Sequence, residues 1–145
     1  MDPYLSKNFP IWRDSQALVL ELERAVKGFA RYHKYTIGSE LRLGAQRVLN
    51  YVSHAINQSE NRTHWLQRLS LQIEELKLLI QTAKMRHVFQ SFKHFEVIAR
   101  LAVQVAKQSK AWLNKSQTKL QRADARTRVG QTQRDPNGQQ EQHDV

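Results

Sequence analysis

The sequence predicts an all-α fold: an up-down-up-down four-helix bundle followed by a disordered C-terminal tail. Apolar residues recur at steps of three and four through four long stretches, which is the spacing of one buried face on a helix. Only five Gly and three Pro interrupt the chain, and no alternating pattern of any length predicts a strand. The connections between the stretches are short, so consecutive helices are expected to run antiparallel.

A single domain is expected, with a change of composition toward the C-terminus. The 145 residues are enough to bury a core. We expect a hydrophobic lead-in over residues 1–13, the bundle over 14–119, and a tail over 120–145 that has almost no large apolar residue. The last helix is expected to fray outward for a turn or two beyond Lys119.

The first two helices each present one apolar stripe. The first is expected to begin at an N-cap, Asp14 or Ser15, and to run to about Tyr32. Its stripe consists of Leu18, Leu22, Ala25, Val26 and Phe29. The second is expected to run from about Thr36 to Gln58. Its stripe consists of Ile37, Leu41, Ala45, Val48, Val52, Ala55 and Ile56.

The last two helices follow the same pattern. The third is expected from residues 61–63 to Lys84, and the fourth from Ser91 to residues 115–119. The third helix has a heptad-like stripe of Trp65, Leu69, Ile73, Leu76, Ile80 and Ala83. The fourth has Phe95, Ile98, Ala99, Ala102, Val105, Ala106 and Leu113 on one side.

The net charge of +10 is concentrated in one part of the chain. Residues 1–14 and 120–145 are each neutral, because they hold equal numbers of Lys/Arg and Asp/Glu. Residues 15–60 hold six cations and four acids, whereas 61–119 hold eleven cations and three acids. The third and fourth helices therefore carry a surplus of eight positive charges. A folded basic surface of this density predicts an anionic partner, most commonly nucleic acid.

Lysines and arginines recur at heptad spacing on both helices. Lys77 and Lys84 are seven residues apart, as are Lys93, Arg100 and Lys107. The predicted nucleic-acid-binding residues are Lys77, Lys84, Arg86, Lys93, Arg100, Lys107, Lys110 and Lys115. Such rows contact phosphates without reading bases, so low sequence specificity is expected. The solvated face of an ordinary amphipathic helix would give the same pattern.

Aromatic residues are few outside the predicted core. The sequence therefore gives no strong indication that exposed Trp or Tyr side chains stack on bases. Trp112 lies off the centre of the apolar stripe of the fourth helix. It is expected at the rim of the core, and a subunit contact or a ligand is the alternative.

Motifs for catalysis and for metal binding are missing from the sequence. The six His form no HxxxH or HExxH pair, and no Cys is present. Glu74 and Glu75 are adjacent, which places them about 100° apart on a helix and makes a shared-proton pair unfavourable. There is no phosphate-binding glycine loop and no nucleophile elbow. We expect a binding protein that is not an enzyme, without cofactor or metal.

The N-terminal sequence has neither a basic region nor a long apolar run, and no 18 apolar residues occur together. We expect no membrane association and a soluble, cytoplasmic protein. The absence of Cys is compatible with a reducing compartment.

Three segments carry a resemblance to a known family: RYHKYTIG at 31–38, IEELKLLIQTAK at 73–84 and KAWLNKS at 110–116. With them, the chain from about Asp14 to Ser116 resembles the four-helix-bundle accessory variability protein (Avd) family of diversity-generating retroelements. The resemblance implies a ring-shaped homopentamer with a basic surface. It also implies binding to a reverse transcriptase and to RNA and DNA, in support of mutagenic cDNA synthesis.

Carried onto this sequence, the resemblance implies an architectural turn at Tyr35 and Gly38, and a last helix that ends with Trp112 and Lys115. The chain departs from the family at 107–111, where KQSKA replaces a glycine-rich approach to the Trp. Intervening-sequence proteins associated with ribosomal RNA genes use the same bundle. A protein-interaction scaffold whose basic face meets an acidic protein is therefore the alternative function.

Overall fold

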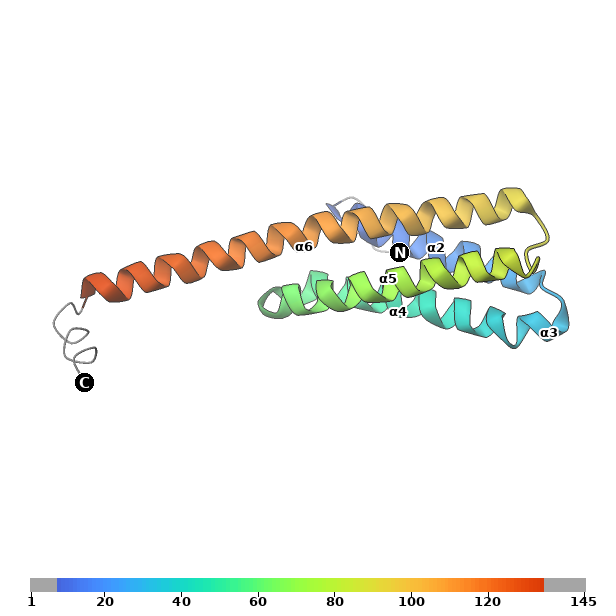
Figure 1. The fold of residues 1–145 in the computed structure, drawn as a ribbon, viewed down its shortest axis with the longest axis horizontal. Helices are drawn as coiled ribbons and strands as arrows, with labels where there is room; N and C mark the ends of the chain where they lie inside the picture. The colour runs from blue at the N-terminus through green and yellow to red at the C-terminus, as the bar shows by residue number, and fades with distance from the viewer. Residues whose placement is uncertain (1–7, 135–145) are drawn as a thin grey trace. The chain divides into compact units, whose positions relative to one another are not determined.

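The protein is all-α, and its helices form a four-helix bundle (Figure 1). The computed structural model describes residues 8–134, with side chains for residues 8–130, and contains no strand within that range. Its elements are α2 (Pro10–Lys27), α3 (Arg31–Lys34), α4 (Ile37–Asn57), the 3-10 helix η1 (Ser59–Asn61), α5 (Arg62–Met85) and α6 (Phe92–Arg134). The chain divides into two compact units, residues 1–113 and 114–145, and the bundle belongs to the first.

The bundle is a square of antiparallel helices. α4 packs against α2 on one side and α5 on the other. α6 closes the square, since Gln108 donates to Asp14 of α2 at 2.9 Å, and the Ser109 and Ser70 hydroxyls, on α6 and α5, are 3.2 Å apart. α4 and α6 therefore lie on the diagonal, and a cation on α4 faces a different side of the bundle from one on α6.

The core consists mostly of the apolar stripes predicted from the sequence, although Ile56, Ala99, Ala106 and Leu113 are only partly buried against it. Leu18, Leu41 and Leu69 are among the residues that are fully buried. On α5, Leu66 is fully buried instead of Trp65, which is half-buried. Trp65 stacks on His54 with ring centroids 4.3 Å apart and donates to the Gln58 side chain at 3.0 Å. Its indole N–H thereby keeps a hydrogen-bond partner, as large amphipathic rings generally do.

The first helix begins earlier and ends earlier than predicted. α2 starts at Pro10, because the fixed φ of proline suits the first helical position, where no N–H is needed. Asp14 and Ser15, expected as N-caps, lie inside α2 and are buried. α2 stops before Gly28, where a Cβ would come 2.6 Å from the Gln90 side chain. The close contact is made with the connection between α5 and α6, and the short helix α3 follows.

The turn into α4 depends on Gly38. A Cβ at this position would lie 2.9 Å from the His33 carbonyl oxygen and 2.9 Å from Val26 Cγ1. Thr36 precedes α4, and its hydroxyl donates to the Tyr32 carbonyl at 2.7 Å rather than to an N–H of α4. Gly38 therefore allows the α3 backbone, the end of α2 and the start of α4 to meet.

The last helix continues beyond its predicted end near Lys119. α6 remains helical to Arg134, so residues 120–134, which were assigned to a tail, belong to a helix. The side chains from 118 to 129 are exposed. Helix-forming Lys, Leu, Gln, Arg and Ala dominate 119–126, and no Gly or Pro occurs there, which explains how a stretch poor in apolar residues remains helical. Residues 1–7 and 135–145 of the predicted lead-in and tail lie outside the described residues.

Candidate nucleic-acid interface

The cations of α6 form a row on the exposed side of the bundle. Lys93, Arg100 and Lys107 are exposed and recur every seven residues, which places neighbours about 10 Å apart along the helix. Ile98 and Val105, on the opposite side of α6, are fully buried. The row therefore points away from the core.

Most of this row has no acidic partner. Arg100 Nη2 lies 4.0 Å from Glu96 Oε2, and both side chains are exposed. An exposed pair of this kind contributes ~0–1 kcal/mol and leaves the cation accessible. Within the part of the chain that the structure describes, Lys93, Lys107 and Lys110 have no carboxylate within 4.0 Å. These cations are therefore uncompensated.

The two predicted site cations of α5, Lys77 and Lys84, contact neighbouring side chains. Lys77 is half-buried, and its Nζ donates to both Glu74 oxygens at 3.2 and 3.3 Å. Lys84 Nζ lies 5.6 Å from the ring centre of Phe92 and 4.9 Å from that of Phe95. Lys77 is thus partly neutralised, whereas Lys84 keeps its charge because a cation–π contact supplies no anion.

The rows of α5 and α6 lie on adjacent antiparallel helices. The contacts between Ser70 and Ser109 and between Lys84 and Phe95 fix the register of the two antiparallel helices, so Lys77 lies level with Ala102. The surface that these two helices present, named here the α5–α6 face, contains Lys77, Lys84, Lys93, Arg100, Lys107 and Lys110, with Glu74 and Glu96 as its acids. It brings together six of the eight predicted site residues. Arg100 also lines a groove between α2 and α6.

The other two predicted cations lie elsewhere. Arg86 is exposed in the connection between α5 and α6, beyond the end of the α5 helix. Lys115 is exposed and belongs to the second compact unit, residues 114–145.

The residues that carry the family resemblance differ in what they contact. Gly38 is buried at the close approach described above, whereas the Tyr35 side chain is 70% exposed and contributes nothing to the core. Trp112 is half-buried at the rim of the core, against the Phe9 ring at 5.9 Å and under the Arg62 guanidinium at 5.4 Å. α6 does not end at Trp112 and Lys115 but continues past them.

Exposed aromatic side chains occur at one end of the bundle, contrary to the sequence-based expectation. Tyr32, Tyr35 and Phe92 are 76%, 70% and 63% exposed. The sequence shows that this end is basic, because residues 24–39 and 76–95 contain no Asp or Glu and hold four Lys/Arg each. Helical periodicity places apolar residues in a core and gives no weight to aromatics in short connections, so it missed them.

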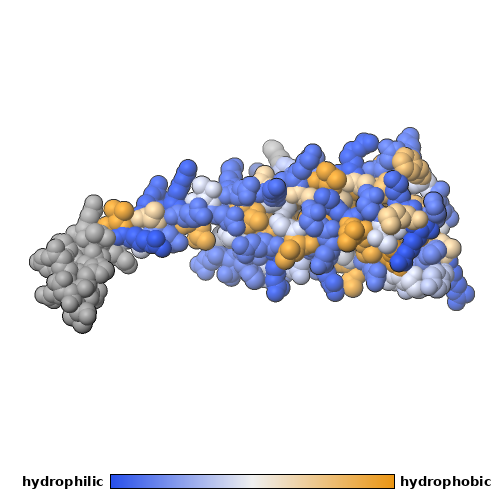
Figure 2. All heavy atoms as spheres, in the orientation of Figure 1, coloured by the Kyte–Doolittle hydropathy of each residue, from blue (hydrophilic) through white to orange (hydrophobic). Residues whose placement is uncertain are grey.

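A second apolar stripe lies on the outer side of α5. Leu71, Leu78 and Met85 recur every seven residues, nearly opposite the buried stripe of α5, and are 70–72% exposed. Figure 2 shows hydrophobic patches set among hydrophilic side chains on this side of the bundle. Glu74 and Glu75, the acids of α5, flank the stripe. Single exposed apolar residues are ordinary, but an aligned row indicates a contact surface.

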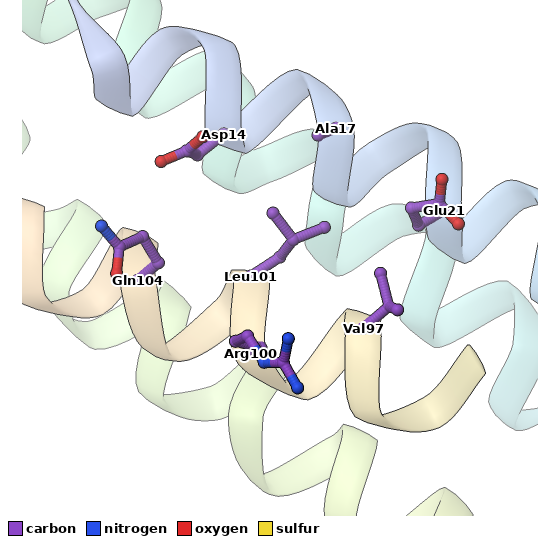
Figure 3. Close-up of a pocket in the computed structure, with 7 residues that line it drawn as sticks. All are labelled: Asp14, Ala17, Glu21, Val97, Arg100, Leu101 and Gln104. Atoms are coloured by element: carbon purple, nitrogen blue, oxygen red, sulfur yellow. The ribbon is translucent and has the colours of Figure 1, made fainter. Parts of the chain in front are cut away.

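A groove of about 330 Å³ lies between α2 and α6 (Figure 3). It is lined by Asp14, Ala17, Glu21, Val97, Arg100, Leu101 and Gln104. Its two carboxylates already have partners: Asp14 accepts from Arg13 at 3.2 Å and from Gln108 at 2.9 Å, and Glu21 accepts from Arg24 at 2.8 Å and lies 2.9 Å from His94 Nε2. In Figure 3, Leu101 reaches between the two carboxylates. The groove thus resembles a helix interface bridged by polar groups more than a pair of catalytic acids.

A smaller groove of about 220 Å³ lies between α4 and α5. It forms beside Gly44, where a Cβ would approach Leu76 Cδ1 to 3.2 Å, and Leu43 and Leu79 line it. Its apolar walls adjoin the exposed stripe of α5.

Across residues 8–134, no cluster of three or more His, Asp or Glu side chains is arranged to hold a metal ion. Over the same residues, no helix combines the length and the apolar character needed to cross a bilayer.

Comparison of the chain with known protein families found no matching family, and comparison with curated proteins found no similar protein.

Proposed function

We propose that this chain is a non-enzymatic accessory factor of a diversity-generating retroelement. In this proposal it acts in the cytoplasm, holds template RNA or cDNA on its α5–α6 face, and docks a reverse transcriptase during mutagenic cDNA synthesis. The residues of the Avd resemblance support the retroelement context, and the charge distribution supports the nucleic-acid role.

The single observation that carries the proposal is the surplus of eight positive charges in residues 61–119, six cations of which share the α5–α6 face. Helices hold these cations. Among the described residues, Lys77 lies 3.2 Å from Glu74, Arg100 lies 4.0 Å from Glu96, and the other four have no carboxylate within 4.0 Å. Lysine and arginine rows on helices bind phosphates through charge and the release of counterions, with little dependence on base sequence.

Self-association into a homopentamer is part of the proposal. The exposed stripe Leu71, Leu78 and Met85 supports it, because such a row is covered in a stable assembly. The occupant we propose is a second copy of the chain. Glu74 and Glu75 flank the stripe. A second copy of this basic chain could place cations against these two acids. In a ring, each copy contacts its neighbour through two different surfaces. The apolar stripe of one copy, flanked by acids, packed against a basic surface of the next copy would be such a contact.

Charge reversal on α6 tests the nucleic-acid role. The variant Lys93→Glu/Arg100→Glu/Lys107→Glu is expected to bind RNA and DNA oligomers at least about tenfold more weakly at low salt, because three phosphate contacts become repulsive. The three side chains are exposed, so circular dichroism should show an unchanged helix content.

The alternative is a protein-interaction scaffold of the ribosomal RNA intervening-sequence type, and the apolar stripe of α5 is the observation that favours it. Co-purification with the reverse transcriptase separates the two functions. If the triple variant loses the polymerase but keeps its affinity for oligomers, the basic face binds an acidic protein and the scaffold function is correct.

A further inference from the structure

The end of the bundle that contains α3 combines exposed aromatic rings with uncompensated cations. Two connections meet there, the one from α2 to α3 and the one from α5 to α6. The rings of Phe29 and Phe89 join them edge to face at 5.4 Å, and Phe89 contacts Phe95 of α6 at 5.5 Å. Phe29, Val88 and Phe95 are buried. These packed aromatic and apolar residues, named here the apolar plug, join the two connections to the start of α6.

Three aromatic rings lie outside the plug. Tyr32 follows the first residue of α3, Tyr35 directly follows α3, and Phe92 opens α6. All three are more than 60% exposed. Tyr32 is in edge contact with His33 at 5.3 Å, and Phe92 has the Lys84 ammonium above its ring. Such exposure is unusual for aromatic side chains, which gain from burial, so the rings are available to a ligand.

The charged residues of the two segments that build this end are cationic, and the acids Glu40 and Glu96 follow the segments directly. The basic residues are Lys27, Arg31, Lys34, Lys84, Arg86 and Lys93. Neither of the two sequence segments that build this end, 24–39 and 76–95, contains an acid. Among the described residues, none of these six cations has a carboxylate within 4.0 Å. Glu23, the last acid before the first segment, is held by Arg42 at 2.8 Å.

We infer that this end of the bundle binds unpaired nucleotides by stacking bases on Tyr32, Tyr35 and Phe92, with phosphates held by the surrounding cations. Single-stranded nucleic acids are bound by this combination, because every base has a π-face and the backbone requires positive charge. A duplex cannot use the rings, since its bases already stack on one another. The inference rests on the proposed nucleic-acid role but assigns a different surface, and it predicts a preference for single strands that the α5–α6 face alone does not give.

The test compares a single-stranded oligonucleotide of about ten nucleotides, carrying 2-aminopurine, with a duplex of the same length at the same salt. Tyr32→Ala and Tyr35→Ala are each expected to lower single-strand affinity about fivefold or more, and to relieve the quenching of 2-aminopurine by stacking. Duplex affinity should stay unchanged. Tyr32→Phe and Tyr35→Phe should keep most of the single-strand affinity, because the ring remains.

Leu20→Ala on α2 is the matched control, because Leu20 is 52% exposed and lies on another element. It should change neither affinity. The inference is overturned if the alanine variants bind the single strand as well as the unaltered chain does, or if single-strand and duplex affinity fall together. It is also overturned if the phenylalanine variants lose as much as the alanine variants.

Arg100→Gln/Lys107→Gln separates this inference from the proposed α5–α6 face, because these two cations lie away from the α3 end. If this variant keeps all its affinity while the tyrosine variants lose theirs, the α5–α6 face is wrong and the α3 end is the binding site. If instead the tyrosine variants keep their affinity and Arg100→Gln/Lys107→Gln loses affinity, the stacking site is wrong and the α5–α6 face is the binding surface. Failure of the unaltered chain to bind either oligonucleotide at low salt would overturn both.

Discussion

The charged residues of this chain divide into those that hold the fold and those that remain free on its surface. Arg62 belongs to the first group although it contributes to the positive surplus. Its Nε donates to the Ala55 carbonyl at 2.8 Å and its Nη2 to the Ile56 carbonyl at 3.2 Å, and its guanidinium covers Trp112. It therefore satisfies carbonyls at the C-terminal end of α4 that have no partner in the helix.

Replacing Arg62 should destabilise the bundle. Arg62→Gln is expected to lower the free energy of unfolding by about 1–3 kcal/mol, because charge-assisted hydrogen bonds to the α4 carbonyls are lost. Urea denaturation followed by circular dichroism measures it. Arg68→Gln is the control, since Arg68 is exposed and its guanidinium lies over the Trp65 ring at 5.8 Å, and it should cost under about 1 kcal/mol. Equal losses in the two variants would contradict the role given to Arg62.

Gly38 should not tolerate a methyl group. Gly38→Ala is expected to cost about 1–3 kcal/mol, because the added Cβ meets the His33 carbonyl and Val26 at 2.9 Å and the backbone must shift. Gly130→Ala is a matched helical control, since nothing lies within 4 Å of its Cβ position, and it should be neutral or stabilising. A Gly38→Ala protein as stable as the unaltered chain in urea would contradict the close packing of α3, α2 and α4.

At the scale of elements, hydrophobic periodicity was sufficient to predict the four long helices and nearly all of their buried residues. It failed where a local preference or a tertiary contact sets the end of a helix. Pro10 starts α2 early, and α2 ends before Gly28, where an added Cβ would come 2.6 Å from the Gln90 side chain. Leu66 is fully buried where Trp65 was predicted, and Trp65 donates to Gln58 at 3.0 Å, a contact that has no periodic signature.

The candidate site was predictable to the extent that it depends on helices. Heptad spacing placed Lys93, Arg100 and Lys107 on one exposed side of α6. It could not show that Lys77 pairs with Glu74, because an acid three residues away is a partner only if the rotamers agree. The exposed aromatic residues at the α3 end could not be predicted, because the sequence does not show that the α2–α3 and α5–α6 connections lie together.

The element that departs most from a simple amphipathic helix is α5, which has apolar residues on two opposite sides. If the outer stripe is covered by a second copy, Leu71→Gln/Leu78→Gln should convert the oligomer to a monomer at micromolar concentration without loss of helix content. Light scattering with circular dichroism measures both. Leu20→Gln is the control and should keep the oligomeric mass. A monomeric mass for the unaltered chain would refute the homopentamer.

At the scale of the whole molecule, the net charge of +10 is unevenly distributed. The α5–α6 face and the α3 end share Lys84 and Lys93, so positive charge continues from one to the other. The cations on α4, such as Arg42, lie on another side of the bundle, and Arg42 is paired with Glu23. This uneven distribution is what distinguishes a polyanion-binding surface from a generally basic protein.

The most direct test of this account is the salt dependence of oligonucleotide affinity for three proteins. The unaltered chain should show a log affinity that falls with log salt with a slope of several units, since each phosphate contact contributes about 0.7 for a single strand and about 0.9 for a duplex. Lys93→Gln/Arg100→Gln/Lys107→Gln should reduce that slope by two to three units. Arg24→Gln/Arg42→Gln/Arg47→Gln, which removes the same charge from α2 and α4, should leave it nearly unchanged. A flat plot for the unaltered chain, or equal reductions in the two variants, would contradict a nucleic-acid surface built from α5 and α6.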